Sequence, residues 1–200
     1  LNYVRLKLKK TGTKEGCAEG GCGACTVVLG ELKNNNIIYK AINSCISFVP
    51  SLEGKLLILV EDLVKKNGTL HPVQDAMIKY HGSQCGFCTP GFVMSLFAMY
   101  KNFNSYNKEK IQDSISGNLC RCTGYRPIID AAKSLNSSNK IDKFYKNRKK
   151  TINFLKKINL ENVALTNGSK KYFSPKNIKE LKKIINHNPN ATFLNTLMWG

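Results

Sequence analysis

Apolar and polar positions in the first third of the chain alternate in short runs, which predicts a small sheet flanked by helices. Leucine or valine at 1, 4 and 8 follows helical spacing, whereas the later runs are β-branched and bounded by polar residues. The expected elements are a helix end at 1–9, strands at 26–29, 37–46 and 55–60, a polar turn at 31–36, and a short helix at 61–66. We expect the helix to pack on a small mixed sheet.

From residue 71 the apolar spacing becomes helical. Proline stands near the start of three of the expected helices, where its missing N–H costs nothing. The expected helices are 72–80, 91–100, 109–116 and 128–135. Residues 91–100 are almost wholly apolar, so this helix is expected at the centre of a compact four-helix bundle. The chain is therefore predicted to be α+β.

The last third of the chain has a different texture. Residues 136–159 are polar and basic, which predicts a surface linker with at most a helical patch. An amphipathic helix at 178–185 and a strand at 191–195 predict the start of a further α/β domain. The predicted divisions are 1–68, 69–136, 137–170 and 171–200.

Composition narrows the class of protein. A chain of 200 residues with 42% hydrophobic residues can bury a core. No signal peptide and no long apolar run is present, which predicts a cytoplasmic protein without a membrane partner. The first residue is leucine, so we expect that an N-terminal piece is missing.

The net charge of +18 raises nucleic acid as a partner. However, 27 of the 31 basic residues are lysine and only four are arginine, and they are spread along the chain. Nucleic-acid interfaces rely on arginine with interleaved aromatic residues. We therefore expect no nucleic-acid partner, although the charge favours an acidic protein partner.

Eight cysteines fall into two groups of four. Cys17, Cys22 and Cys25 lie in the glycine-rich stretch TGTKEGCAEGGCGACT, and Cys45 follows later. This spacing is the plant-type [2Fe–2S] pattern, with three thiolates on one loop and a fourth from a later segment. Glycines allow the loop to wrap tightly around a small cluster. A structural zinc loop or a disulfide knot is the alternative.

The second group consists of Cys85 and Cys88 in SQCGFCTPG, and Cys120 and Cys122 in GNLCRCTGYRP. Each pair stands just before an expected helix start, where the positive end of the helix dipole stabilises an anionic site. By itself this group suits an iron–sulfur cluster or zinc. Beside the first group it predicts a second [2Fe–2S] cluster.

Three stretches resemble the iron–sulfur part of the xanthine dehydrogenase and aldehyde oxidase family of molybdenum hydroxylases: GTKEGCAEGGCGACTV, QCGFCTPGFVMS and SGNLCRCTGYRPIIDA. The resemblance covers residues 1 to about 132. It implies a ferredoxin-like β-grasp [2Fe–2S] domain over 1–68 and a four-helix [2Fe–2S] domain over 69–136. It also implies that electrons pass from a molybdenum–pterin site through both clusters to FAD and then to NAD⁺.

The same resemblance implies roles for particular residues. The group that includes Cys17 would hold the cluster nearer the flavin, and the group that includes Cys85 would hold the cluster nearer the molybdenum cofactor. Gln84 matches a glutamine that hydrogen-bonds the pterin, although its position alone would suit a polar residue at a helix end. The molybdopterin would belong to a large partner subunit.

The C-terminal stretch YFSPKNIKELKKIINHNPNATFLN resembles the opening of the family's flavin domain, as in the small subunit of bacterial xanthine dehydrogenases. The family's Gly-Gly-Thr-Asp loop does not follow it, so 171–200 would be a truncated start and FAD would bind only a full-length form. The family's opening β-hairpin is also missing before Leu1. These features predict a fragment with a basic linker at 137–170.

We therefore expect an electron-transfer subunit of an oxidoreductase with no catalytic residue of its own. His71, His81 and His187 are scattered, and each is expected on the surface or at a helix cap. The main alternative is the [2Fe–2S] small subunit of an aldehyde or carbon monoxide oxidoreductase. A zinc-stabilised binding module is a further alternative.

Overall fold

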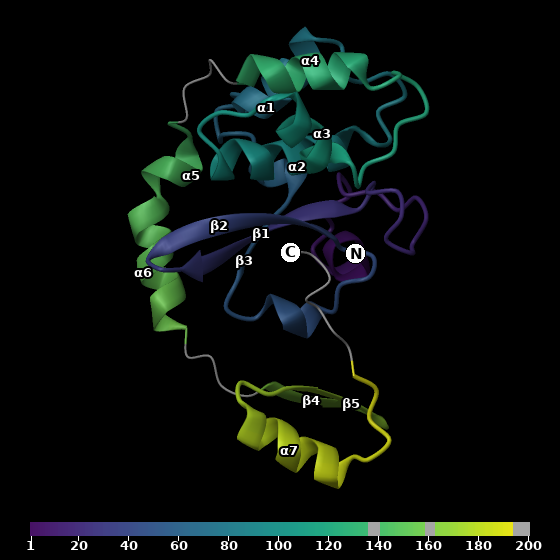
Figure 1. Ribbon diagram of the computed structural model, residues 1–200, viewed down its shortest axis with the longest axis vertical. Helices are drawn as coiled ribbons and strands as arrows, with labels where there is room; N and C mark the ends of the chain where they lie inside the picture. Colours follow the sequence, from purple (N-terminus) through teal and green to yellow (C-terminus); the bar gives the residue numbers. More distant parts are fainter. Residues whose placement is uncertain (136–140, 159–162, 194–200) are drawn as a thin grey trace. The chain divides into compact units, whose positions relative to one another are not determined.

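The structure is a computed structural model that describes residues 1–135, 141–158 and 163–193 (Figure 1). The chain forms two compact units, Leu1–Lys157 and Ile158–Gly200. Among the described residues, no helix has the length and apolar character needed to cross a membrane. All eight cysteines lie in the first unit.

The first unit contains a three-stranded sheet of β1 (Thr26–Lys33), β2 (Asn36–Asn43) and β3 (Leu56–Ile58), in the order β2-β1-β3. Both pairings are antiparallel, so the expectation of a mixed sheet was wrong. The turn between β1 and β2 is only two residues long because Asn34 and Asn35 both adopt positive φ, as a tight hairpin requires.

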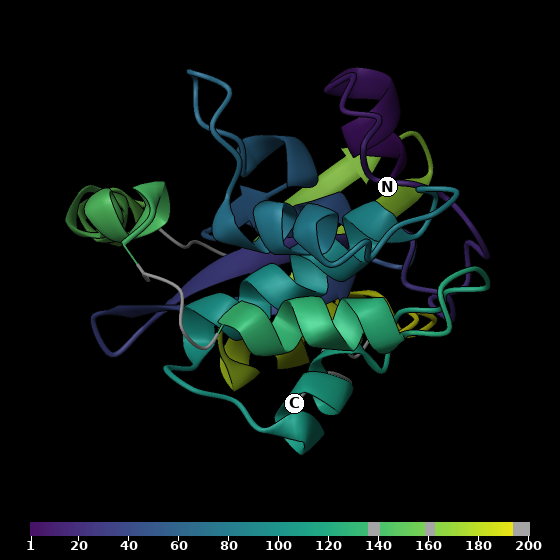
Figure 2. The ribbon, with the colours of Figure 1, turned by 90° about the horizontal axis from the view of Figure 1, so that it is seen from above.

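Four helices follow the sheet in the chain, and all four were predicted in place to within a few residues. They are α1 (Pro72–Lys79), α2 (Thr89–Asn102), α3 (Lys108–Ile115) and α4 (Arg126–Ser134). Proline stands in the first turn of α1, α2 and α4, as expected. Helix α2 packs on β1 and β2 on one side and on α1 and α3 on the other. Figure 2 looks onto the helical layer from above, with α4 nearest the viewer.

Helix α2 forms the centre of the first unit. Every residue from Gly91 to Tyr100 is buried, so the helix is enclosed on all sides, as its almost continuous apolar sequence predicts. Phe92, Phe97 and Leu96 are fully buried and belong to the hydrophobic core that also includes Val28 of β1 and Ile128 of α4. One core therefore joins the sheet to the helices.

Shorter helical turns complete this part of the chain. A π-helical segment, Tyr3–Lys7, stands where the helix end was expected, and 3₁₀ turns lie at Val49–Leu52 and Val60–Asp62. The expected helix at 61–66 was wrong beyond its first turn. Gly68 adopts a positive φ, and Lys65 donates its N–H to the carbonyl of Thr69, so the chain turns back instead of continuing as a helix.

The segment expected to be a surface linker with at most a helical patch contains two helices, α5 (Lys143–Lys146) and α6 (Arg148–Lys157). Helix α6 buries Ile152 and Leu155, which lie on one face, and it packs on β1 and β2. This short apolar face gave only a weak signal in the sequence, because basic residues surround it. Residues up to Lys157 therefore belong to the first unit.

In the second unit the structure describes a hairpin of β4 (Val163–Asn167) and β5 (Lys170–Ser174) followed by α7 (Ile178–His187). The hairpin was not predicted, although β4 begins with three apolar residues and the chain turns at Gly168 and Ser169. Helix α7 was predicted and begins at Asn177, whose side chain accepts the N–H of Glu180. Residues 191–193 have no regular structure, so the expected strand at 191–195 is absent there, and its remainder lies outside the described residues.

Candidate metal centre

The first group of cysteines lies on a tightly wound loop before β1. Ala18, Gly20 and Gly23 adopt positive φ, so the chain folds back on itself within a few residues. The backbone N–H groups of Gly21 and Cys22 both donate to Sγ of Cys17, each at 3.3 Å. A thiolate at this position is therefore stabilised by backbone dipoles, as iron–sulfur ligands commonly are.

Strands β1 and β2 bring the remaining two cysteines of this group together. Cys25 directly precedes β1, and Cys45 follows the end of β2, which pairs with the start of β1. The carbonyl of Cys25 accepts hydrogen bonds from the backbone N–H of Ser44 at 3.3 Å and from its hydroxyl at 2.7 Å. The Sγ atoms of Cys25 and Cys45 are 3.2 Å apart. Antiparallel pairing thus closes a sequence gap of twenty residues.

The thiols of the first group differ in their tendency to ionise. A hydrogen bond from the backbone of Glu19, followed by the contact with the thiol of Cys22, lowers the pKa of Cys17 to about 7. Burial raises the pKa of Cys25 to about 11. A bound metal ion overcomes such a penalty because it deprotonates a coordinating thiol outright. Within this group, the thiol of Cys17 therefore ionises more readily than the buried thiol of Cys25.

The second group lies where α2 and α4 begin. Cys88 is the N-cap of α2, and Cys120 and Cys122 lie in the turn before α4. The thiol of Cys122 lies close enough to Cys85 to influence its pKa, and the thiol of Cys120 influences the pKa of Cys88 in the same way. Each pair joins a cysteine of the loop before α2 to a cysteine of the loop before α4, so the fold brings the two loops together to form this group.

Hydrogen bonds from the turn before α4 hold Cys120 in place. Thr123 contacts its Sγ through both the hydroxyl, at 3.1 Å, and the backbone N–H, at 3.4 Å. The backbone N–H of Cys120 donates to the hydroxyl of Tyr125 at 3.0 Å. Burial would raise the pKa of Cys120, but these contacts with Thr123 lower it, whereas burial raises the pKa of Cys88 to about 12.

The thiols approach one another in pairs. All eight cysteines are free, which contradicts the alternative of a disulfide knot. Within residues 1–135, 141–158 and 163–193, no three or more His, Cys, Asp or Glu side chains surround a point that would suit a single metal ion. A structural zinc site needs about four ligands around one ion, whereas each iron of a [2Fe–2S] cluster takes two thiolates. A pair of thiols is the number that one iron of such a cluster takes.

The other residues singled out in the sequence lie apart from the thiol pairs. Gln84 is exposed beside the exposed Cys85, so its side chain is accessible to a partner. His81 and His187 are exposed. His71 caps α1, with Nδ1 accepting the N–H of Val73, and it is buried. These positions agree with the expected surface and capping roles.

Sequence reasoning missed several buried polar residues that organise the site. Asn118 and Ser95 hydrogen-bond each other between the two cysteine groups, and Asp142 contacts His71 and Lys101. Ser95 could have been noticed as a polar residue inside the apolar run of α2. Asn118 stands two residues before Cys120, so its place in the cysteine motif SGNLCRC could have drawn attention to it.

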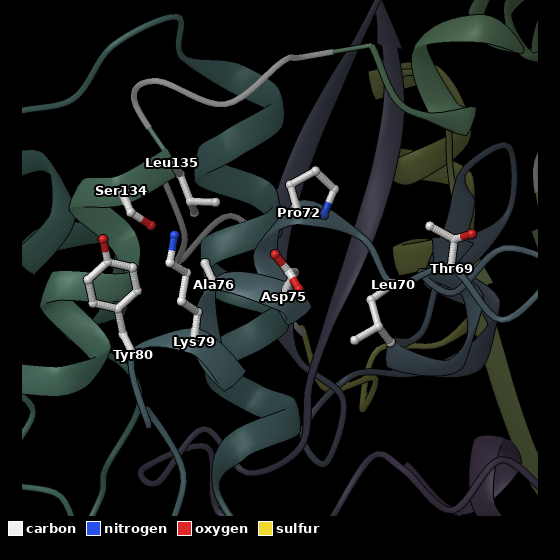
Figure 3. A pocket seen from close by; sticks show the side chains of 9 residues that line it. All are labelled: Thr69, Leu70, Pro72, Asp75, Ala76, Lys79, Tyr80, Ser134 and Leu135. Carbon is white, nitrogen blue, oxygen red and sulfur yellow. The ribbon is translucent and has the colours of Figure 1, made fainter.

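A cavity of about 520 Å³ lies away from the cysteines, between α1 and the end of α4 (Figure 3). Asp75 and Lys79 of α1, with Tyr80 directly after it, line one part of it, and Ser134 and Leu135 line another. No cysteine lines this cavity, so it is separate from the candidate metal centre.

Comparisons with known proteins agree with this geometry. The family model described as "[2Fe-2S] binding domain" matches residues 59–133. The chain is 53% identical over 137 residues to "Xanthine dehydrogenase" of Blastobotrys adeninivorans, and 47% identical over 136 residues to "Aldehyde oxidase 1" of Oryctolagus cuniculus. Each match covers 67% of this chain and 10% of the relative. The chain therefore spans about a tenth of the length of these relatives.

Solved structures share the fold. The structure of quinoline 2-oxidoreductase from Pseudomonas putida 86 is similar with a TM-score of 0.59 and 30% sequence identity, over 74% of this chain and 82% of that chain. An aldehyde oxidoreductase from Desulfovibrio gigas is similar with the same TM-score and 31% identity, over 77% of this chain and 16% of that chain. Sequence and structure thus point to the same group of oxidoreductases.

Proposed function

Because this chain belongs to the xanthine dehydrogenase and aldehyde oxidase family of molybdenum hydroxylases, we propose that it transfers electrons through two [2Fe–2S] clusters inside a larger oxidoreductase. The observation that carries the proposal is the gathering of eight free cysteines into two groups whose thiols approach in pairs. Such a cluster supplies one-electron oxidation and reduction when it is bound.

We assign the first cluster to Cys17, Cys22, Cys25 and Cys45. Cys17 and Cys22 would hold the cluster as one pair of thiolates, and Cys25 and Cys45 as the other. The backbone N–H groups that donate to Cys17 and the hydrogen bonds that fix Cys25 against Ser44 hold these ligands in place. The glycine loop excludes bulky side chains from the same space.

We assign the second cluster to Cys85, Cys88, Cys120 and Cys122. Cys85 and Cys122 would hold the cluster as one pair of thiolates, and Cys88 and Cys120 as the other, because the members of each pair influence each other's pKa. Cys88 caps α2, so the positive end of that helix dipole lies at this group and favours its negative charge. Thr123 contacts Sγ of Cys120 and so orients this ligand.

The rest of the electron route is proposed from the family. Substrate oxidation would take place at a molybdopterin site in a partner, which Gln84 would contact from its exposed position beside Cys85. Electrons would then pass from the second cluster to the first, and onward to FAD and NAD⁺. We propose residues 1–68 and 69–136 as the two cluster domains, and 171–200 as the start of a flavin domain.

A second candidate is the iron–sulfur subunit of an oxidoreductase whose flavin lies on another chain. The similarity to quinoline 2-oxidoreductase favours it, because this chain covers 82% of the matched chain there. The reading frame of the gene distinguishes the two candidates. A continuation that encodes a flavin-binding domain supports the first, and a stop soon after residue 200 supports the second.

Metal analysis and electron paramagnetic resonance test the proposed function. After anaerobic assembly with iron and sulfide, the 200-residue chain is expected to hold about four irons and about four labile sulfides, as two clusters require. Upon reduction, two distinguishable [2Fe–2S] signals are expected. Zinc bound without labile sulfide would contradict the proposal.

Two reciprocal cysteine variants test the ligand groups. Cys122→Ser is expected to remove one of the two signals and leave the other, because its thiol belongs to the second group alone. Cys17→Ser is the matched control and should remove the opposite signal. If both signals survive in either variant, the assignment of that cysteine is wrong.

A further inference from the structure

The two cysteine loops meet at a direct backbone contact. The backbone N–H of Leu119 donates to the carbonyl of Cys22 at 2.9 Å. Cys22 belongs to the first group, and Leu119 is the immediate neighbour of Cys120, which belongs to the second. Backbone bonds and this one hydrogen bond therefore connect a cysteine of one group to a cysteine of the other.

Asn118 holds this contact from within the core. Its side chain is only 3% exposed. Its amide Nδ2 donates to the carbonyl of Gly23 at 3.0 Å and to the hydroxyl of Thr26 at 3.1 Å, and its Oδ1 accepts from the hydroxyl of Ser95 at 2.5 Å. Because a carbonyl can only accept, the nitrogen of the amide must face Gly23. One side chain thus joins the first loop, the second loop and α2.

Two glycines allow the backbones to approach this closely. A Cβ atom at Gly23 would lie 2.2 Å from the carbonyl oxygen of Gly117, and a Cβ atom at Gly91 would lie 2.2 Å from the carbonyl oxygen of Gly23. Real Cβ atoms do not come so near, and a backbone carbonyl in the core has little room to move. The close approach of the backbones therefore depends on the absence of a side chain at Gly23 and at Gly91.

We propose that Asn118 is a positioning residue that sets the geometry between the two cysteine groups by locking the hydrogen bond between Leu119 and Cys22. It touches no thiol in this arrangement, and acts through the backbone on either side of it. The proposed function gives this buried amide no other role. An apolar side chain at this position would leave the hydrogen-bonding partners of Asn118 unsatisfied.

This inference rests on the proposed function. The reaction concerned is the transfer of one electron between the two clusters. One cluster would be oxidised as the other is reduced, and no proton or other group would be transferred. The role of Asn118 is to keep the two ligand loops at a fixed separation while that happens. Small displacements of reacting partners have large effects on rates.

The test compares Asn118→Ala with the wild-type 200-residue chain after iron and sulfide assembly. Exchange of the Leu119 amide hydrogen, followed by mass spectrometry, is expected to become faster by roughly tenfold when the amide anchor is lost. Redistribution of an electron between the two clusters, started by a flash-activated reductant, is expected to slow by roughly tenfold or more. A role in stability alone would not alter the second measurement in a fully loaded chain.

Asn102→Ala is the matched control. Asn102 also joins α2 to the sheet, because its amide donates to the carbonyl of Tyr39 at 2.6 Å and accepts the Tyr39 N–H at 3.0 Å. It lies at the other end of α2 from Cys88. This variant is expected to leave both the Leu119 exchange and the redistribution of the electron unchanged.

Ser95→Ala keeps the test decisive if Asn118→Ala does not load iron. It removes only the donor to Oδ1 of Asn118, so both effects are expected in the same direction but smaller. Wild-type exchange and wild-type electron redistribution in the loaded variants would overturn the role of Asn118. A wild-type chain that binds iron without labile sulfide would instead overturn the proposed function.

Discussion

At the scale of single residues, the carbonyl oxygen of Gly23 accepts three hydrogen bonds at the junction of the cysteine loops. The donors are the backbone N–H of Thr26 at 3.1 Å, the hydroxyl of Thr26 at 2.6 Å and the amide of Asn118 at 3.0 Å. The glycines near the cysteines predicted a tightly wound loop. Gly23 satisfies that need through its positive φ, but it and Gly91 also make room for a second backbone.

Gly91→Ala tests this close contact. Its Cβ would lie 2.2 Å from a backbone oxygen that cannot move aside easily, so we expect the free energy of unfolding to fall by about 1–3 kcal/mol, as overpacking of a core does. Denaturant unfolding of the variant and the wild-type chain measures this difference.

Gly117→Ala is the control for that measurement. A Cβ atom at Gly117 would meet nothing within 4 Å, so the free energy of unfolding should change by less than about 1 kcal/mol. Equal effects of the two substitutions would contradict the argument from close contact.

At the scale of elements, Asp142 joins three helices around one buried carboxylate. It caps α5 by accepting the N–H of Tyr145 at 2.7 Å, and it accepts from Nζ of Lys101 in α2 at 2.8 Å. Nε2 of His71, the cap of α1, lies 3.0 Å away. Because Nδ1 of His71 accepts the N–H of Val73, the proton lies on Nε2 and is donated to Asp142. This cluster attaches α5 and α6 to the rest of the first unit.

The cluster predicts that the first unit loses stability in mild acid. Burial lowers the pKa of His71, although Asp142 acts in the opposite direction. A group whose pKa is lower in the folded chain stabilises the fold above its unfolded pKa, which is about 6.5 for histidine. As the pH falls below that value, the unfolded chain gains a proton that the folded chain resists. We expect the free energy of unfolding to decrease between pH 7 and pH 5, as measured by denaturant titration at each pH.

Asp142 adds a second loss at lower pH. Burial opposes ionisation of this carboxyl, but hydrogen bonds from His71 and Lys101 outweigh it and lower its pKa to about 2. Its contribution is therefore complete above about pH 4 and is lost as the pH falls towards 2. At pH 7, Asp142→Asn should cost about 3–5 kcal/mol because it leaves Lys101 buried without its carboxylate.

Asp130→Asn is the matched control for that variant. Asp130 pairs with Lys133 at the surface of α4, where 37% of its side chain is exposed. Such pairs contribute less than about 1 kcal/mol. A stability that stays constant from pH 7 to pH 5, or equal losses in the two aspartate variants, would contradict the role given to the buried cluster.

At the scale of the whole molecule, the metal centre and its supports lie within one unit. Residues 1–157 contain all eight cysteines, the Asn118 contact and the Asp142 cluster. In the second unit, the described part of α7 has no buried residue, so it contributes little core of its own. We therefore expect the candidate centre to form without residues 158–200.

A shortened chain that ends at Lys157 should retain about four irons and both paramagnetic signals after assembly. Its ligand loops keep every contact described above, so neither cluster loses support. Iron and sulfide analysis with electron paramagnetic resonance measures the outcome, and the loss of either signal would show that the second unit is required.

A chain that ends at Leu135 provides the contrasting control. It lacks Asp142, Ile152 and Leu155, so His71 and Lys101 lose their partner and α6 no longer covers the sheet. We expect a lower midpoint of denaturant unfolding than for the chain that ends at Lys157. Equal midpoints would mean that α5 and α6 do not stabilise the first unit.

The sequence by itself determined what depends on neighbouring residues. Helix α2 follows from the apolar run 91–100, the starts of α1, α2 and α4 follow from their prolines, and the cysteine spacing identified the family. Each of these signals is local, since backbone conformation and ligand spacing are set within a few residues. Short segments carried weaker signals: α6 was expected only as a helical patch, and the hairpin of β4 and β5 was missed.

Only the tertiary structure decided which distant groups meet. It made both strand pairings antiparallel, brought the thiol of Cys25 to that of Cys45, and placed the amide of Asn118 against the carbonyl of Gly23, 95 positions away in the chain. Contacts across such distances depend on how the common core packs, because sheet and helices share one set of buried side chains. No local pattern in the sequence encodes that packing.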